Sequence, residues 1–214
     1  MASAPPTPGP EPRTRTQRFL LMAIVLAGFL VLATGLLLFV ISRDDPRGIA
    51  GTVLSNTIGG PFRLIDQNGR PFTDADLRGK WHLVFFGYTH CPDVCPTTLN
   101  ELSLAHDRLG KERDQVGIVM ITVDPQRDTQ ETLKSYIASF DAPVTALTGT
   151  EEQVAEAARA YRVYSARRAK EDGNYDMDHS AVIYVMDPQG RLTATFTPDS
   201  GADAIAERMR KLLS

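Results

Sequence analysis

The only two cysteines of the chain, Cys91 and Cys95, are the residues whose type and spacing most directly indicate chemistry. They stand in the sequence CPDVC, which is one residue longer than the C-x-x-C spacing of common disulfide oxidoreductases. Residues four apart on a helix lie on one face, so the two sulfur atoms would be neighbours there. The pair therefore suits either a disulfide or two ligands of one soft metal ion.

The sequence around the cysteines predicts the elements that position them. The apolar run His82–Tyr88 is typical of a buried strand, and a helical pattern continues from near Cys95 to Leu109, where Gly110 ends it. A helix N-terminus offers free amide donors and the positive end of the helix dipole, and both stabilise a thiolate. This placement favours reactive or metal-binding sulfur over a purely structural disulfide.

The composition limits what else the chain can do. It has 214 residues, 43% of them hydrophobic, and a formal net charge of −3, which indicates one globular domain with accessory segments. We expect no nucleic-acid partner, because the near-neutral charge supplies no basic field for one. Two cysteines are too few for a disulfide scaffold or a four-thiolate zinc site.

Residues 19–41 carry no charged side chain. A helix of that length is about 35 Å long, enough to cross a hydrocarbon core of about 30 Å. A cleaved secretory signal usually has an apolar region of about 7–15 residues and a small-x-small cleavage site, whereas this stretch is longer and lacks such a site. We predict an uncleaved transmembrane signal anchor, with a cleaved signal as the alternative.

The charges that flank this stretch predict its orientation. Three arginines and one acid precede it, whereas the two arginines that follow are matched by two aspartates. The positive-inside rule then places the N-terminus in the cytoplasm and the domain across the membrane. The expected divisions are a disordered cytoplasmic tail at 1–18, the anchor at 19–41, a tether at 42–55 and a globular domain at 56–214.

The domain alternates short strands and helices. A hairpin is predicted around Asn68-Gly69, and a capping box is predicted at Asp128 with Glu131 and at Thr150 with Gln153. We interpret the polar residues 165–178 as an exposed loop. The further strands are expected at Val116–Val123, Pro143–Leu147, Ala181–Met186 and Arg191–Thr197, and the further helices at 128–140, 151–161 and 202–213.

Continuously apolar strands that alternate with helices predict an α/β fold with helices on both faces of a central sheet. The final strand pair returns on itself, so the sheet should be mixed. A cysteine pair after the first inner strand, behind an N-terminal β-hairpin, is the order of a thioredoxin-like fold.

Four stretches resemble the Sco/SenC family of membrane-anchored copper-binding proteins that are needed to assemble cytochrome c oxidase. They are GGPFRLIDQNG, DLRGKWHLVFFGYTHCPDVCPTTL, ITVDPQRDT and DHSAVIYVMD. The combination of CPDVCP with a DHS sequence about 80 residues later carries the resemblance, which covers about residues 52–214. It implies that Cys91, Cys95 and His179 bind one copper ion, Cu(I) or Cu(II).

The resemblance also implies a role and a place in the cell. The protein would be a metallochaperone at the inner membrane, with a periplasmic domain that delivers copper to the binuclear copper centre of cytochrome c oxidase subunit II. An upstream copper donor or a thiol reductant would be a further partner. Two thiolates and an imidazole suit copper better than hard cations, and a structural zinc site would need a fourth ligand.

Two enzymatic functions are the alternatives to a metallochaperone. In a thiol–disulfide reductase, Cys91 would attack a target disulfide and Cys95 would resolve it, and the loss of His179 would be tolerated. A peroxidase of this fold would use a Thr-x-x-Cys arrangement with a supporting arginine. Thr89 stands only two residues before Cys91, and no arginine is found in that loop.

The other candidate polar residues have more ordinary expected roles. We expect His90 to be structural rather than a fourth ligand, and His82 and His106 to lie outside the site. Asp124 and Asp128 are expected to cap and turn the chain after a strand, with partner docking as an alternative role of their loop. Asp93 is expected to shape the cysteine loop or contact a partner, and Asp178 is expected to orient His179 or form a turn.

Overall fold

The computed structural model describes residues 26–34 and 58–214. Residues 26–34 are helical, and within the two described stretches no helix has the length and apolar character that crossing a membrane requires. The predicted tail at 1–18, the tether at 42–55 and the rest of the predicted anchor at 19–41 lie outside the described residues, so these remain predictions.

The domain is built on a seven-stranded sheet with the strand order β2-β1-β5-β4-β3-β8-β9. The three central strands β3, β4 and β5 run parallel, and the other pairs are antiparallel, which confirms the predicted mixed sheet. The side chains of β3 and β4 are almost all buried, which explains their continuously apolar sequences. The strands are β1 Arg63–Asp66, β2 Pro71–Thr73, β3 Trp81–Gly87, β4 Val116–Thr122, β5 Val144–Thr148, β8 Ile183–Met186 and β9 Leu192–Phe196.

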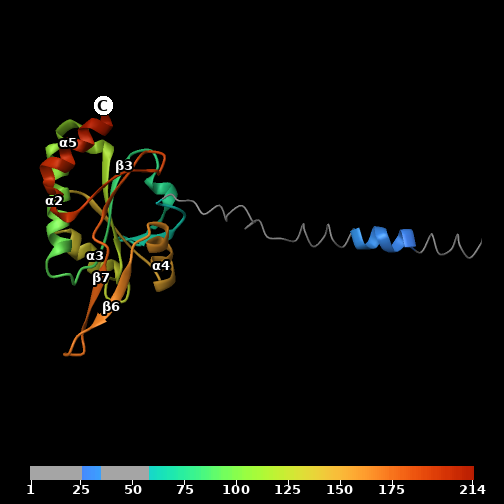
Figure 1. Ribbon diagram of the computed structural model, residues 1–214. Coiled ribbons are helices and arrows are strands. Elements are labelled where there is room, and N and C mark those ends of the chain that lie inside the picture. Colours follow the sequence, from blue (N-terminus) through green and yellow to red (C-terminus); the bar gives the residue numbers. More distant parts are fainter. Residues whose placement is uncertain (1–25, 35–57) are drawn as a thin grey trace, which may run out of the picture. The chain divides into compact units, whose positions relative to one another are not determined.

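Helices cover both faces of this sheet, as predicted. Figure 1 shows α2, α3 and α5 on one side of the strands and α4 on the other. The helix α5 packs on α2, and its buried residues are Ala202, Ile205, Ala206 and Met209. The helices are α2 Val94–Arg108, α3 Gln130–Ile137, α4 Glu151–Ala160 and α5 Gly201–Leu213, with short 3₁₀ turns at Asp74–Leu77, Gly110–Gln115 and Pro198–Ser200.

Two of the predicted local signals are confirmed. The β1–β2 hairpin turns at Gly69, which has a φ of +78° and donates its N–H to the carbonyl of Asp66 at 2.9 Å. Thr150 and Gln153 form both hydrogen bonds of a capping box at the start of α4.

The predicted capping box at Asp128 is wrong. Thr129 is the N-cap of α3, and its hydroxyl accepts the N–H of Thr132 at 3.2 Å. Asp128 is buried, and its carboxylate binds Thr89 and Thr122 instead. Because the carboxylate of Asp128 accepts hydrogen bonds from these two threonines, it does not cap the N-terminal amides of α3.

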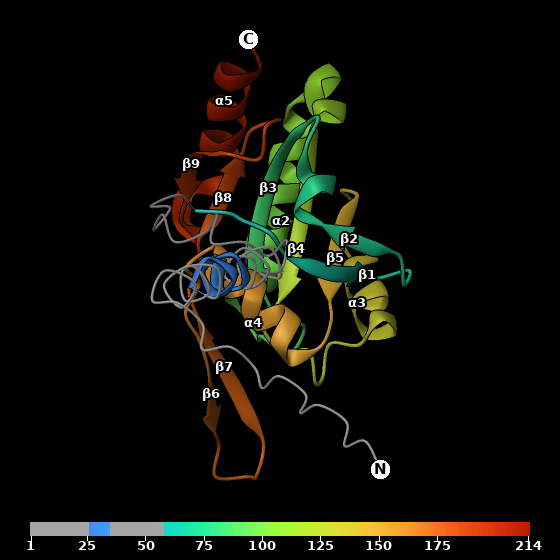
Figure 2. The same ribbon diagram turned by 90° about the vertical axis from the view of Figure 1, so that its right-hand side faces the viewer.

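The predicted loop at residues 165–178 is also wrong, because this segment forms an antiparallel hairpin. Its strands, β6 Ser165–Ala169 and β7 Tyr175–His179, make a separate two-stranded sheet. The residues SARRA of β6 do not alternate apolar and polar types, whereas YDMDH in β7 does alternate over five residues. A strand signal is therefore present in β7 but absent from β6. Ion pairs across the hairpin, such as those of Arg168 with Asp176 at 3.2 Å and with Asp178 at 3.1 Å, accompany the backbone pairing. Figures 1 and 2 show the hairpin projecting from the domain.

Candidate metal centre

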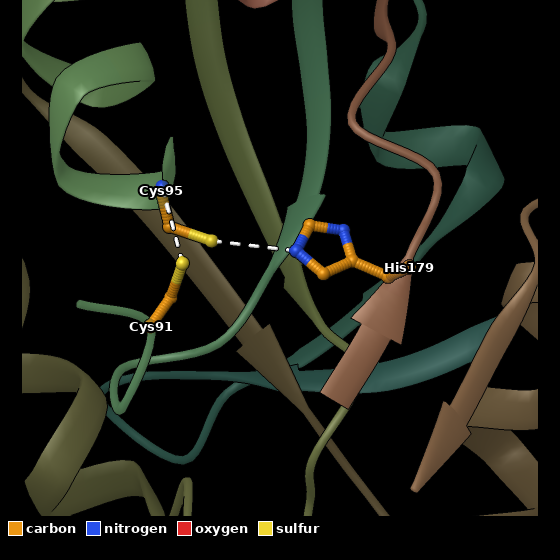
Figure 3. Close-up of side chains that lie close together, drawn as sticks. All are labelled: Cys91, Cys95 and His179. Carbon is orange, nitrogen blue, oxygen red and sulfur yellow. Dashed lines mark hydrogen bonds between the residues drawn. The ribbon is translucent and has the colours of Figure 1, made fainter. Parts of the chain in front are cut away.

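The side chains of Cys91, Cys95 and His179 converge from three different elements (Figure 3). Cys91 lies in the loop after β3, Cys95 in the first turn of α2, and His179 at the end of β7. Their two sulfur atoms and an imidazole nitrogen all lie within 4.8 Å of one another. Among the described residues, this is the one group of three or more His, Cys, Asp or Glu side chains that could hold a metal ion.

The loop after β3 brings Cys91 back to the helix. The N–H of Cys91 donates to the carbonyl of Tyr88 at 3.3 Å, and Asp93 stands at the N-cap of α2. The N–H of Cys95 then donates to the sulfur of Cys91 at 3.4 Å. Cys91 therefore receives one of the unpaired amides at the helix N-terminus, as the sequence predicts.

The two thiols are free, and their environments differ strongly. Cys95 is 0% exposed, whereas Cys91 is partly exposed. Hydrogen bonding from Cys95, then from His179 and from the amides of Asp93 and Cys95, outweighs burial and lowers the pKa of Cys91 to about 4. The shared hydrogen bond with Cys91 and burial raise the pKa of Cys95 above its ordinary value. In the reduced protein Cys91 is thus the thiolate and Cys95 the thiol.

The imidazole of His179 is held with one nitrogen directed at the cysteines. Its Nε2 lies 3.5 Å from the sulfur of Cys95, and its Nδ1 lies 3.3 Å from the carbonyl oxygen of Ser180. The rings of Phe85 and Tyr88 meet the imidazole edge-on, with centroid distances of 6.2 and 5.8 Å. In the neutral tautomer that donates from Nδ1 to the Ser180 carbonyl, the lone pair of Nε2 would be free to bind a metal ion.

Gly87, at the end of β3, leaves room for the buried sulfur. A Cβ atom at this position would lie 3.0 Å from the sulfur of Cys95 and 2.7 Å from the ring of Phe85. The strand can therefore pass close beneath Cys95 only because no side chain is present.

The family model described as SCO1/SenC matches residues 51–214 of the chain. The chain belongs to the SCO1/SenC family. A SCO2-like protein of Rickettsia prowazekii is 39% identical over 191 residues, which cover 86% of this chain and 93% of the relative. The mitochondrial SCO2 homolog of Mus musculus is 43% identical over 155 residues, which cover 71% of this chain, and the match spans 61% of the length of the mouse protein.

Solved structures of this family show the same fold. The structure of Bradyrhizobium japonicum ScoI with copper bound has 46% sequence identity and a TM-score of 0.68, and the match covers 72% of this chain and 98% of that one. Yeast Sco1 with copper bound has 34% identity and a TM-score of 0.68, with 73% and 88% covered. A thioredoxin-like domain is consistent with this family, so the predicted fold class of the globular part is confirmed.

Within this SCO1/SenC domain the other histidines lie apart from the three converging side chains. His90 is exposed, and its Nδ1 lies 3.0 Å from the hydroxyl of Thr89. His82 lies at the far end of β3, where burial and the nearby charge of Lys80 lower its pKa to about 4. His106 is buried near the far end of α2.

The aspartates differ from one another. Asp178 pairs with Arg168 instead of orienting His179. Asp93 is exposed and makes no side-chain capping bond. The carbonyl of Asp124 accepts the N–H of Asp128 at 2.9 Å, so the predicted turn after β4 is confirmed.

Asp128 fixes the start of the cysteine loop, a role that its sequence pattern does not reveal. Its carboxylate accepts the N–H of Thr89 at 3.1 Å, the hydroxyl of Thr89 at 2.6 Å and the hydroxyl of Thr122 at 2.6 Å. Burial raises the pKa of Asp128, and the bonds from the two threonines oppose that shift. The only sequence signal for this contact is the presence of both segments in the stretches that resemble the family.

The unequal thiols lead to a prediction for the reduced, metal-free protein. Iodoacetamide should modify Cys91 at nearly constant rate from pH 6 to pH 8, because its pKa of about 4 makes it fully ionised throughout. An ordinary thiol, with a pKa of about 8.5, would react about tenfold faster for each pH unit in most of this range. Mass spectrometry of digested samples measures both sites, and Cys95 should stay unmodified.

A rate at Cys91 that rises steeply with pH would contradict the assignment of the thiolate. Unfolded protein in denaturant is the control, since both cysteines should then titrate alike.

Proposed function

We propose that this protein is a copper metallochaperone in which Cys91, Cys95 and His179 bind one copper ion and deliver it to the binuclear CuA centre of cytochrome c oxidase subunit II. The observation that carries the proposal is the convergence of the three donor atoms within 4.8 Å. The copper named in the solved ScoI and Sco1 structures supports the choice of metal.

The donor set explains why copper would be held and also given up. Two soft sulfur donors and an imidazole favour copper over hard cations. Cys91 already supplies a thiolate, whereas Cys95 must release its proton when the metal binds. Three protein ligands leave the metal open to a thiolate of the receiving protein, so transfer proceeds by exchange of ligands without any other bond being made.

We also propose that residues 19–41 anchor the protein in the inner membrane, with 1–18 in the cytoplasm and 42–55 as the tether of a periplasmic domain at 56–214. The charge-free stretch and its flanking arginines support this placement. One solved relative, from Bacillus anthracis, is described as a SCO1/SenC family lipoprotein. A reporter enzyme that is active only outside the cytoplasm, fused after Ser214, should be active; activity of a cytoplasmic reporter alone would overturn the orientation.

A thiol–disulfide reductase is the second candidate function, and the unequal thiols favour it. The Cys91 thiolate would attack a target disulfide and release one target thiolate. Cys95 would then lose its proton, attack the sulfur of Cys91 and release the second target thiolate, which leaves a Cys91–Cys95 disulfide. A separate thiol reductant would restore the dithiol. This activity would keep the cysteines of the receiving copper site reduced.

Metal titration of the purified full chain distinguishes the two functions. We expect the reduced protein to bind about one Cu(I) per chain in competition with a chelator, and to pass it to the reduced apo copper domain of subunit II. The same domain with its cysteines oxidised is the control, since it offers no thiolate. If this protein fails to retain copper but rapidly reduces the oxidised copper domain of subunit II, the reductase function would be favoured.

A further inference from the structure

The hairpin that carries His179 is attached to the domain in an unusual way. Its strands β6 and β7 pair only with each other, and among the described strands neither is hydrogen-bonded to the central sheet. Its base is closed by Ser180, whose N–H donates to the carbonyl of Tyr164 at 3.0 Å. The position of His179 over the cysteines therefore depends on contacts between the hairpin and other parts of the domain.

Arg127 makes several of these contacts. Its Nη1 donates to the carbonyl of Tyr175 at 3.0 Å and lies 3.4 Å from the side-chain oxygen of Asn174, at the turn end of β7. Its guanidinium carbon lies 3.7 Å from the centroid of the Tyr175 ring, a cation–π contact. The side chain is only 16% exposed, so these contacts are largely removed from water.

Asp124 completes the attachment from the domain side. It is 1% exposed, it accepts the Nε hydrogen of Arg127, and it also accepts the hydroxyl of Tyr175 at 2.9 Å. The buried carboxylate is therefore paired with a charge and hydrogen-bonded, as burial of a charge requires. We call Asp124, Arg127 and Tyr175 the hairpin clamp.

The clamp reaches His179 along two routes. Tyr175, Met177 and His179 alternate along β7, so their side chains leave the strand on the same face. The ring of Tyr88 forms the second route, since its centroid lies 5.8 Å from the Arg127 guanidinium and 5.8 Å from the His179 ring. A displacement of the Arg127 guanidinium would thus move both β7 and the Tyr88 ring that lies beside the imidazole.

We propose that Arg127 is a positioning residue of the metal centre. Its side chain holds the β6–β7 hairpin, and with it His179, within reach of Cys95. Arg127 itself does not contact the metal; it acts through the place of the imidazole. The inference rests on the proposed copper function for its effect on metal affinity, while its effect on the hairpin is independent of any metal. Loss of residues that orient a metal-binding histidine typically lowers metal affinity by about 10–100-fold.

Arg168 provides a matched control on the same hairpin. It is an arginine with two ion pairs, to Asp176 and Asp178, but its side chain is 59% exposed and its partners lie within the hairpin itself. Arg127 lies between β4 and α3, whereas Arg168 lies in β6. Arg168→Ala therefore also removes an arginine that contacts β7, but without releasing the hairpin from the domain.

The test is a set of Cu(I) affinities for the full chain, measured by chelator competition. Arg127→Ala should weaken binding about tenfold or more, whereas Arg168→Ala should leave it within about twofold of the unchanged protein. Arg127→Lys keeps the charge beside Asp124 but not the planar group stacked on Tyr175, so it should recover only part of the loss. In a His179→Ala background, Arg127→Ala should cause no further loss, because the residue acts through the imidazole.

An equal loss in both backgrounds, or an equal loss in Arg168→Ala, would overturn the proposal. If Arg127→Ala does not fold, Tyr175→Leu serves instead, since it removes the stacked ring and keeps the backbone carbonyl; no loss of affinity there would likewise overturn it.

Hydrogen exchange of the metal-free protein gives a readout that does not need copper. The amides of Tyr175–His179 should exchange faster in Arg127→Ala than in the unchanged protein, and Arg168→Ala should have much less effect. Unchanged exchange in Arg127→Ala would show that the clamp does not hold the hairpin. Failure of the unchanged protein to bind copper, with exchange altered as expected, would instead contradict only the proposed copper function.

Discussion

Replacing either cysteine by alanine is expected to abolish stoichiometric copper binding, with bound copper falling from about one ion per chain to near zero after purification. Either substitution removes one of the two soft donors and leaves a sulfur and an imidazole. Cys95→Ala also removes the hydrogen bond that contributes most to the lowered pKa of Cys91, so the pKa of the remaining thiol should rise and less of it should be ionised. Metal analysis after gel filtration and the uptake of Cu(I) against a chelator measure the loss.

Two controls separate this loss from a loss of folding. Val94→Ala changes an exposed side chain between the cysteines and should retain copper. Because Cys95 is fully buried, its replacement leaves a small cavity, so circular dichroism should confirm that Cys95→Ala is folded. Retention of copper at the level of the unchanged protein in either cysteine variant would refute the proposed ligand set.

His179→Ala is expected to lower copper affinity by more than about tenfold while leaving a dithiol that can still be oxidised and reduced. The imidazole is the only nitrogen donor of the three converging side chains, and its loss leaves two sulfurs with no third ligand. The optical spectrum of the Cu(II) form should change as well. Chelator competition measures the affinity, and thiol counting after mild oxidation measures the dithiol.

His90→Ala is the matched control, because His90 adjoins Cys91 in sequence but is exposed and outside the converging group. It should bind copper like the unchanged protein. If His179→Ala retained copper through purification and restored a full oxidase in cells, the carrier function would fail, whereas the reductase function would survive. The two substitutions therefore test the step at which the two proposed functions differ.

The elements that position the two cysteines could be predicted from residue patterns, because local rules govern the formation of these elements. An apolar run, a proline-bearing loop and a helical pattern predict a strand, a turn and a helix, and β3, the loop and α2 follow in that order. The unequal ionisation of Cys91 and Cys95 required coordinates, since it depends on which thiol is buried and which amide points at it.

His179 could be assigned to the site only through the family resemblance. Residues 84 positions apart meet because β7 ends beside the cysteine loop, and no spacing rule predicts that contact. Its strand escaped prediction because the alternation in β7 covers only five residues and its partner strand β6 shows none. The partners of those residues, such as Arg168 with Asp178 and Arg127 with Tyr175, are visible only in three dimensions.

Asp128 shows how a correct rule can mislead. An aspartate followed three residues later by glutamate fits the start of a helix, and α3 does begin two residues after Asp128, at Gln130. The carboxylate is nevertheless directed inward, where it joins Thr89 to Thr122. A local pattern cannot reveal that a long-range partner competes for the same side chain.

The unequal burial of the two cysteines means that the candidate metal centre is open to solvent on one side only. Cys95 lies against Gly87 in the interior, whereas Cys91 borders solvent. In the proposed transfer, an incoming thiolate of a receiving protein would approach from the side of Cys91, so Cys95 should be the last ligand to dissociate. In the proposed transfer, the order of ligand exchange would thus depend on which sulfur is buried.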